Sequence, residues 1–186
     1  MTRQRIVATL AGLSLAAILS NGCFLQTVKL VSIDLGNVSA VNGATLYSRY
    51  VDLEAENSTY RDNKDKFSNV EDVAVLGTFK NNLGTGVNAE VWIVRNPSTP
   101  LTTEASVRSA GTLVWSLTLG PNESKSLHWD NAADLFNDAG KDAVKDELEG
   151  DAVFTLYVIG STGTYDVTAT NASVAVVIGI DPFGAP

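Results

Sequence analysis

Short runs that alternate apolar and polar residues dominate the chain after residue 26, and turn-forming residues separate them at regular intervals. Alternation with a period of two places one face of a strand in a core and the other face in solvent. Many short strands at this spacing predict an antiparallel β-sandwich. The expected strands are Thr27 to Leu35, Thr45 to Ala55, residues 73–80, Val87 to Val94, residues 113–119, Ser124 to Trp129, Ala152 to Ile159, Tyr165 to Thr170 and Val174 to Ile180.

Two turns are expected to close hairpins. The turn at residues 81–84 precedes Val87 to Val94, and the turn at residues 120–123 precedes Ser124 to Trp129. Short Asn- and Gly-containing turns between alternating runs are typical of paired antiparallel strands. The last run, Val174 to Ile180, is apolar on both faces and therefore predicts a central strand.

One segment has a different period. Apolar residues recur at spacings of three and four between residues 131 and 149, which predicts an amphipathic helix or helix pair lying on the sandwich. Gly150 is expected to close this helical insertion, and Gly140 to split it. Two polar stretches, Glu56 to Asn69 and Asn96 to Thr103, are interpreted as loops.

Two phrases resemble bacterial immunoglobulin-like domains. Residues 77–82, Gly-Thr-Phe-Lys-Asn-Asn, followed by Gly86 to Val94, are similar to the hairpin of those domains. Residues 117–127 are similar to their Leu-x-Pro-Gly-Glu-Ser turn, with Asn122 in the Gly position. Both are packing and turn motifs, so the resemblance implies a fold and carries over no functional residue. The expected fold class is mainly β, an antiparallel immunoglobulin-like β-sandwich with one helical insertion.

The first 26 residues follow another pattern. Arg3 and Arg5 precede an apolar run from Ile6 to Leu19, which has the length of a signal-peptide core and is short for a bilayer span. The segment resembles a bacterial lipoprotein precursor, cleaved before Cys23 and lipid-modified on that sulfur. The expected organisation is a signal peptide at 1–22, a lipidated N-terminus and short tether at 23–26, and the sandwich domain at 27–186.

The alternative for Cys23 is ordinary secretion with a free N-terminal thiol. A lipobox usually has Leu three residues before the cysteine, whereas Ser20 stands there and Leu19 comes one place earlier; Ser20 and Gly22 also fit ordinary cleavage. Cys23 is the only cysteine, and acylation explains an unpaired thiol in an oxidising compartment. Phe24, in place of Asp, resembles the outer-membrane pattern of two-membrane bacteria. We expect an exported protein anchored there by lipid.

The net charge and the length of the chain limit which classes of partner it can bind. Removal of residues 1–22, which hold two arginines and no acidic residue, takes the net charge from −8 to −10 and leaves 164 of the 186 residues. A chain this acidic is a poor ligand for nucleic acid. Its length allows a stable core without disulfides. The expected partners are the membrane, through the lipid, and other envelope proteins.

A catalytic interpretation of the one polar row fails on geometry. Ser124, Ser126, His128 and Asp130 share a face of an expected strand. Neighbours on one strand face stand about 6.6 Å apart, whereas a triad needs hydrogen bonds of about 3 Å that converge from different elements. His128 is the only histidine, which excludes multi-histidine metal sites. We therefore expect no enzyme but a structural or protein-interaction module.

An aromatic surface is the first candidate binding site. Trp92 lies on the polar face of its expected strand, and Tyr47 or Tyr50 is expected nearby. Such a surface stacks on a sugar ring or packs on a partner protein. The alternative is that the helix or the long loop covers Trp92. Trp115 and Trp129 are expected in the core.

A calcium site is the second candidate. Its carboxylate and amide ligands would be Asp62, Asn63, Asp65 and Asp72. An EF-hand loop that starts at Asp62 fails, because Lys64 and Lys66 occupy its third and fifth positions. The alternative is a solvated loop whose charges neutralise each other. Carbohydrate or calcium binding at the cell surface is thus the second functional hypothesis, and no other cofactor is expected.

Overall fold

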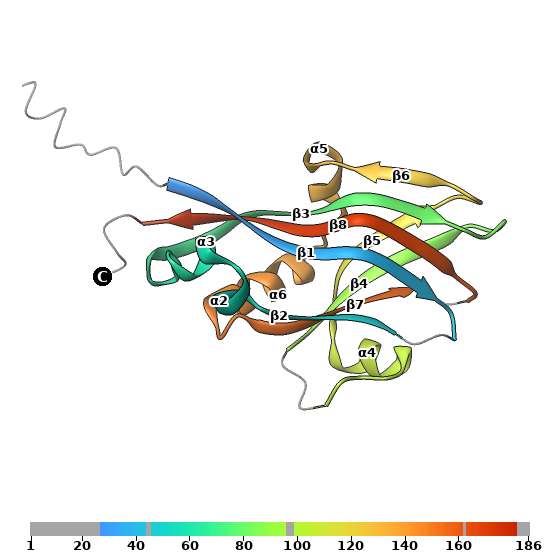
Figure 1. Ribbon diagram of the computed structural model, residues 1–186, viewed down its shortest axis with the longest axis horizontal. Coiled ribbons are helices and arrows are strands. Elements are labelled where there is room, and N and C mark those ends of the chain that lie inside the picture. The colour runs from blue at the N-terminus through green and yellow to red at the C-terminus, as the bar shows by residue number, and fades with distance from the viewer. Residues whose placement is uncertain (1–26, 44–45, 96–98, 162, 182–186) are drawn as a thin grey trace, which may run out of the picture.

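The computed structural model describes residues 27–43, 46–95, 99–161 and 163–181 (Figure 1). In this part of the chain, strands form two four-stranded antiparallel sheets that enclose one hydrophobic core. The strands are β1 (Thr27–Val41), β2 (Tyr47–Asp52), β3 (Phe67–Asn81), β4 (Val87–Arg95), β5 (Thr112–Leu119), β6 (Ser124–Leu127), β7 (Val153–Gly160) and β8 (Asp166–Ile180). The helices are α2 (Leu53–Glu56), α3 (Ser58–Arg61), η1 (Lys64–Lys66), α4 (Glu104–Ala110), α5 (Trp129–Ala132), η2 (Ala133–Leu135) and α6 (Asp138–Glu149).

The strand order is nested. One sheet, sheet A, has the order β1-β8-β3-β6, and the other, sheet B, has the order β2-β7-β4-β5. The first strand therefore pairs with the eighth, the second with the seventh, the third with the sixth and the fourth with the fifth, which is a jelly roll. The expected mainly β antiparallel sandwich is confirmed. Its connectivity is not the immunoglobulin order, in which several consecutive strands are sheet neighbours.

The two expected hairpins are corrected by this topology. β3 lies in sheet A and β4 in sheet B, and the chain crosses between the sheets again from β5 to β6. The two turns instead bond to each other: the Asn81 side-chain amide donates to Gly120 O at 2.8 Å, and Asn122 N donates to Leu83 O at 2.8 Å. Asn81 is fully buried. The turn residues were correctly located, but they reverse the chain between sheets.

Sheet A bends along one row of residues. Gly36 in β1, Gly77 in β3 and Asn171 in β8 all have left-handed φ values of 66°, 134° and 52°. The pairing register shifts at Gly36 and around Gly77. A Cβ at Gly77 would stand 3.0 Å from Ala172 Cα, so a side chain there would crowd the backbone of β8 as well as being strained at this φ. β8 continues through this bend from Asp166 to Ile180. The two strands expected at Tyr165 to Thr170 and at Val174 to Ile180 are therefore one bent strand.

The core lies between the sheets. Phe79 of sheet A meets Trp115 of sheet B with ring centroids 5.1 Å apart. Trp115 is fully buried, as expected, whereas Trp129 is only half-buried and donates its Nε1–H to Asp72 at 3.1 Å. β8 lies between β1 and β3, which confirms the prediction of a central strand.

The expected helical insertion is present as α5, η2 and α6. The break falls before Asn137, whose Oδ1 caps α6 by accepting from Gly140 N at 2.6 Å. Gly140 therefore does not split the helix. It lies inside α6, where a Cβ would collide with the backbone of Val114 in β5, and so it allows the helix to pack directly on the sheet edge.

The other helices were not expected. α2 and α3 follow β2 directly, so the second strand ends at Asp52 and part of the expected loop at 56–69 is helical. Each begins at a capping side chain: Asp52 Oδ1 accepts from Ala55 N at 3.0 Å, and Asn57 Oδ1 accepts from Tyr60 N at 2.9 Å. Such caps stabilise helices too short to show periodicity. α4 likewise starts with a capping box at Thr103.

Candidate functional site

The proposed lipidation residue, Cys23, lies outside the described residues. The described chain starts with β1 at Thr27, so only residues 24–26 separate Cys23 from the first strand. None of the helices in the described ranges could span a bilayer.

Trp92 faces outward from sheet B but is covered. Arg108 of α4 lies over its ring, with Cζ 5.4 Å from the ring centroid, and Trp92 Nε1 donates to Glu90 Oε2 at 2.9 Å. Trp92 is thus half-buried under α4, a helix that was not expected from the sequence. Tyr47 does not join it in one surface, whereas the strand register puts Tyr50 on the same face of sheet B as Trp92, on the other side of β7. Tyr47 donates its hydroxyl to Leu35 O of the other sheet at 2.5 Å.

Tyr50 is the exposed aromatic residue of the three, with 53% of its surface accessible. It lines a hollow of about 120 Å³ together with Ser48, Pro100, Thr155 and Tyr157. The Tyr157 hydroxyl accepts from Leu101 N at 3.0 Å, so one of its bonds is already made. The hollow is small beside ligand pockets, which usually measure about 300 Å³ or more.

The structure does not bring the proposed calcium ligands together. Asp62 is exposed beside Arg61, Asn63 donates its side-chain amide to Thr59 O at 2.7 Å, and Asp72 accepts from Trp129 and from Val73 N. Asp65 lies at the rim of a separate hollow. Within the described ranges, no group of three Asp, Glu, His or Cys side chains is placed to hold a metal ion.

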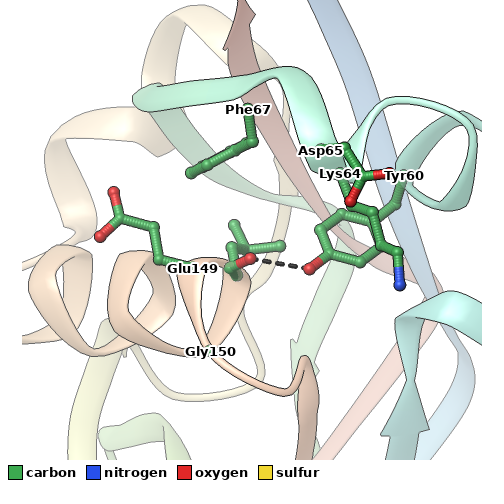
Figure 2. A pocket seen from close by; sticks show the side chains of 7 residues that line it. Tyr60, Lys64, Asp65, Phe67, Glu149 and Gly150 are labelled. Atoms are coloured by element: carbon green, nitrogen blue, oxygen red, sulfur yellow. Dashed lines mark hydrogen bonds between the residues drawn. The ribbon is translucent and has the colours of Figure 1, made fainter. Parts of the chain in front are cut away.

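That separate hollow, of about 360 Å³, lies between η1 and the end of α6 (Figure 2). Tyr60 donates its hydroxyl to Leu148 O across its floor at 2.7 Å. Burial raises the pKa of Tyr60, and the charge of Asp151 raises it further. A buried, neutral hydroxyl with a backbone partner is a structural tie between α3 and α6. Lys64 pairs with Glu54, so its ammonium is already neutralised.

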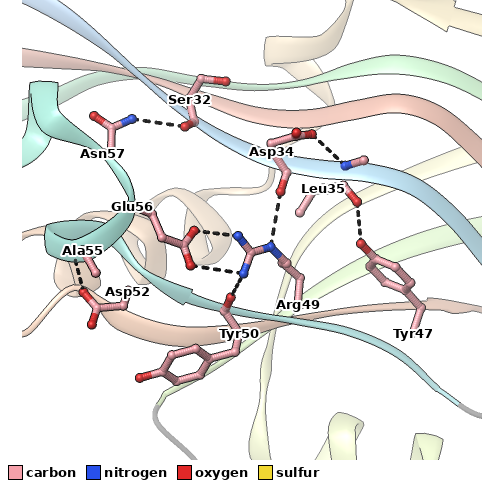
Figure 3. Close-up of polar contacts among 11 residues, drawn as sticks. Ser32, Asp34, Leu35, Tyr47, Arg49, Tyr50, Asp52, Ala55, Glu56 and Asn57 are labelled. Atoms are coloured by element: carbon pink, nitrogen blue, oxygen red, sulfur yellow. Dashed lines mark hydrogen bonds and ion pairs between the residues drawn. The ribbon is translucent and has the colours of Figure 1, made fainter.

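Side chains from β2 and α2–α3 cover the middle of the β1 edge (Figure 3). The Asn57 amide donates to Ser32 O at 3.2 Å, Arg49 Nε donates to Asp34 O at 3.4 Å, and Tyr47 donates to Leu35 O. Arg49 also forms a bidentate pair with Glu56 at 3.1 and 2.6 Å. The adjoining hollow of about 440 Å³ is therefore lined by groups that already bond to one another.

Among the described residues, none places such a cover over the first part of β1. β1 is the outer strand of sheet A, and Val28 and Leu30 are 55% and 56% exposed. We call residues 27–31 the open edge. The open edge was not predicted from the sequence, although one signal is present there: apolar residues stand at 28 and 30 as well as at the buried positions 31 and 33, so both faces of the strand are apolar here.

The Ser-His row is broken by the structure. β6 ends at Leu127, so His128 lies after the strand and Asp130 lies in α5. Ser126 Oγ bonds to Thr78 Oγ1 at 3.0 Å across the β3–β6 pair. No hydrogen bond joins the His128 ring to the serines or to Asp130 in the described chain. His128 is exposed.

No protein-family model and no curated protein matches the chain. Its structure is similar to that of a marine algae virus of the order Picornavirales, with 12% identity over 81% of this chain and 72% of that chain and a TM-score of 0.31. A structure of the Gx strain of infectious bursal disease virus is also similar, with 10% identity and a TM-score of 0.28. The match covers 85% of this chain and 33% of that chain. The VP2 subviral particle of the same virus matches with 13% identity, 82% and 33% of the chains and a TM-score of 0.27. TM-scores this low establish neither a shared fold nor a shared function.

Proposed function

We propose that the protein is an exported, lipid-anchored protein of the cell envelope that acts as a non-enzymatic protein-interaction module. The observation that carries the proposal is the position of Cys23. It stands after the apolar run from Ile6 to Leu19 and only four residues before the start of β1 at Thr27. An acylated cysteine at this position ties the folded domain to the membrane.

The tether is short. Four residues span at most about 14 Å when fully extended. The start of β1 therefore stays within that distance of the lipid-bearing residue. Each acyl methylene buried in the bilayer contributes about 0.8 kcal/mol, so a multiply acylated cysteine anchors stably. The outer membrane of a two-membrane bacterium is the location that we propose.

Support for an interaction module comes from the surface. In the two larger hollows, Tyr60, Lys64, Arg49 and Asn57 already bond within the fold. The largest exposed apolar side chains include Val28 and Leu30, side by side on the open edge close to the anchor. Exposed apolar residues grouped in this way favour contact with another protein.

Mass spectrometry of the full-length protein, extracted from membranes with detergent, tests the anchor. We expect an N-terminal fragment that begins at Cys23 and carries acyl chains. Cys23→Ala should release the protein from the membrane or stall its processing, whereas Val41→Ser, an exposed change elsewhere, should leave it anchored. An unmodified Cys23 in a protein found in the soluble fraction would contradict the proposal.

Carbohydrate binding at Tyr50 is the second candidate. An exposed aromatic ring beside the Ser48 and Thr155 hydroxyls provides a stacking surface with polar neighbours. Titration with soluble cell-wall glycan fragments would test it. Tyr50→Ala should abolish any binding, and Tyr50→Trp should retain it. Binding that survives Tyr50→Ala would remove this candidate.

A further inference from the structure

We propose that the open edge of β1 binds an extended segment of another envelope protein, which adds to sheet A as a fifth strand. The added strand would carry apolar side chains at alternate positions and an acidic side chain opposite Lys29. This inference names the kind of partner for the interaction module and therefore rests on the function proposed above. It is carried by the backbone, the side chains and the charge of residues 27–31.

The backbone of Val28 and Leu30 faces away from the sheet. In an antiparallel pair, a residue directs both its N–H and its C=O either toward its neighbour or away from it. The carbonyls of Ser32 and Asp34 point away from β8, because side chains of Asn57 and Arg49 bond to them. Val28 and Leu30 share that orientation by the two-residue period of the strand. Among the described residues, nothing bonds to their outward groups.

The protection of this edge is selective. Natural proteins usually cover an exposed strand edge, because its free backbone groups recruit other strands. Here Asn57, Arg49 and Tyr47 cover the carbonyls of residues 32, 34 and 35 and stop there (Figure 3). Asn57 thereby marks one limit of the open edge. About five residues of about 3.3 Å each remain, which gives room for a short strand.

The apolar side chains of the open edge also favour an added strand as its occupant. Val28 and Leu30 point to one face and are more than half exposed, and Leu30 pairs with the half-buried Val177 of β8. A bilayer would bury these side chains but would leave their outward backbone groups without partners, which is unfavourable in hydrocarbon. An added strand both completes the backbone hydrogen bonds and covers the apolar side chains.

Lys29 argues against a second copy of the chain and for an acidic partner. If two copies of the chain paired antiparallel with Val28 of one opposite Leu30 of the other, Lys29 of the first copy would lie opposite Lys29 of the second. Like charges at directly opposed positions destabilise a sheet. No acidic side chain of the described chain forms an ion pair with Lys29. An acidic residue on a partner strand would be attracted to it and would fix the register.

The test uses the full-length protein in detergent and a fluorescein-labelled peptide of alternating Glu and Val residues. We expect saturable binding by fluorescence polarisation, and at least about tenfold weaker binding of the matched Lys-Val peptide, which corresponds to about 1.4 kcal/mol. Lys29→Glu should reverse this preference. Hydrogen exchange should slow at the amides of Val28 and Leu30 when the acidic peptide is bound.

Leu30→Pro removes an outward N–H at a position where an edge strand tolerates proline. It should weaken binding of the acidic peptide about tenfold or more, and Leu30→Ser, which keeps the N–H, should weaken it less. Val41→Ser, an exposed change at the other end of β1, should have no effect. Unchanged melting temperatures would show that the variants are folded.

Four results would overturn the inference. The first is that neither peptide binds, and the second is that Leu30→Pro leaves binding of the acidic peptide unchanged. The third is a dimer in sedimentation that dissociates in the Leu30→Pro variant. The fourth is binding of the protein to lipid vesicles that is lost in the Leu30→Ser variant. The dimer would assign the edge to a second copy, and the vesicle result would assign it to the membrane. The acylation state of Cys23 is measured separately, so loss of peptide binding with Cys23 acylated refutes the edge and leaves the anchor intact.

Discussion

The guanidinium group of Arg108 lies over the indole ring of Trp92, with Cζ 5.4 Å from the ring centroid. Arg108 Nη1 also donates to Glu90 Oε2 at 2.5 Å, and the other arm donates to the carbonyl of Gly160. Glu90 is only 8% exposed. Arg108 therefore holds α4 against the outer face of sheet B and neutralises a buried carboxylate there.

Arg108→Ala should lower the free energy of unfolding by about 2–3 kcal/mol, because it leaves Glu90 buried without a cationic partner. Urea unfolding measures this change, and a red shift of tryptophan fluorescence should accompany it as Trp92 is uncovered. Arg108→Lys should recover part of the loss. A change of less than about 0.5 kcal/mol would show that α4 is held by other contacts.

Gly140→Ala should separate α6 from β5. The added methyl group would meet the backbone of Val114, which cannot move aside as a flexible side chain can. We expect a loss of about 1–3 kcal/mol in the free energy of unfolding, in spite of the better helix propensity of alanine. Gly84→Ala, where a Cβ meets nothing within 4 Å, is the matched control. Equal stability of the two variants would refute the close approach.

Glu147 should make stability fall with pH in the weakly acidic range. Burial raises the pKa of Glu147 above its ordinary value, and Arg95, although it pairs with this carboxylate at 2.7 Å, offsets only part of the shift. As pH rises above about 4.5, Glu147 ionises in the unfolded chain before it does so in the folded one. From pH 4 to pH 7, the free energy of unfolding of the wild type should therefore fall relative to that of Glu147→Gln, which has no carboxyl group to ionise at this position. The opposite trend in urea unfolding would show that the ion pair dominates.

Tyr165 should add a loss of stability at alkaline pH. Burial raises the pKa of its hydroxyl, and the hydrogen bond that it donates to Glu104 Oε1 at 2.7 Å raises it further. Above about pH 10, tyrosine ionises in the unfolded chain but not at this site, so folding loses free energy as pH rises. Tyr165→Phe should be less stable than wild type at pH 8 and should decline less steeply above pH 10. Parallel thermal-melting profiles would contradict this assignment.

Chelation should not change the melting temperature. Asp72 is engaged by Trp129, and Asp62 and Asn63 bond locally, so the proposed calcium ligands do not converge. We expect the same thermal unfolding curve in excess EDTA and in millimolar calcium. A stabilisation by calcium that disappears in Asp62→Asn would restore the calcium hypothesis.

The candidate surfaces were only partly predictable. The period of two correctly placed Trp92 on the outward face of β4, but its cover comes from α4, a helix of 7 residues that is too short to show a hydrophobic period. Val28 and Leu30 were read as part of an ordinary alternating strand. Their exposure depends on β1 being an outer strand and on where the side chains of Asn57 and Arg49 end their cover.

The sequence by itself determined much of the local structure: where the strands lie within a few residues at some ends and up to six at others, which of their faces are apolar, where the chain turns at residues 81–84 and 120–123, and that a helical insertion follows β6. These features depend on side-chain period and on turn chemistry within a few residues. Only the tertiary structure decided the pairing. β1 and β8, and β2 and β7, are far apart in the chain, and the turns at residues 81–84 and 120–123 specify a reversal but not a neighbour. Strand pairing is the collective result of burying every apolar face at once, so no local pattern contains it.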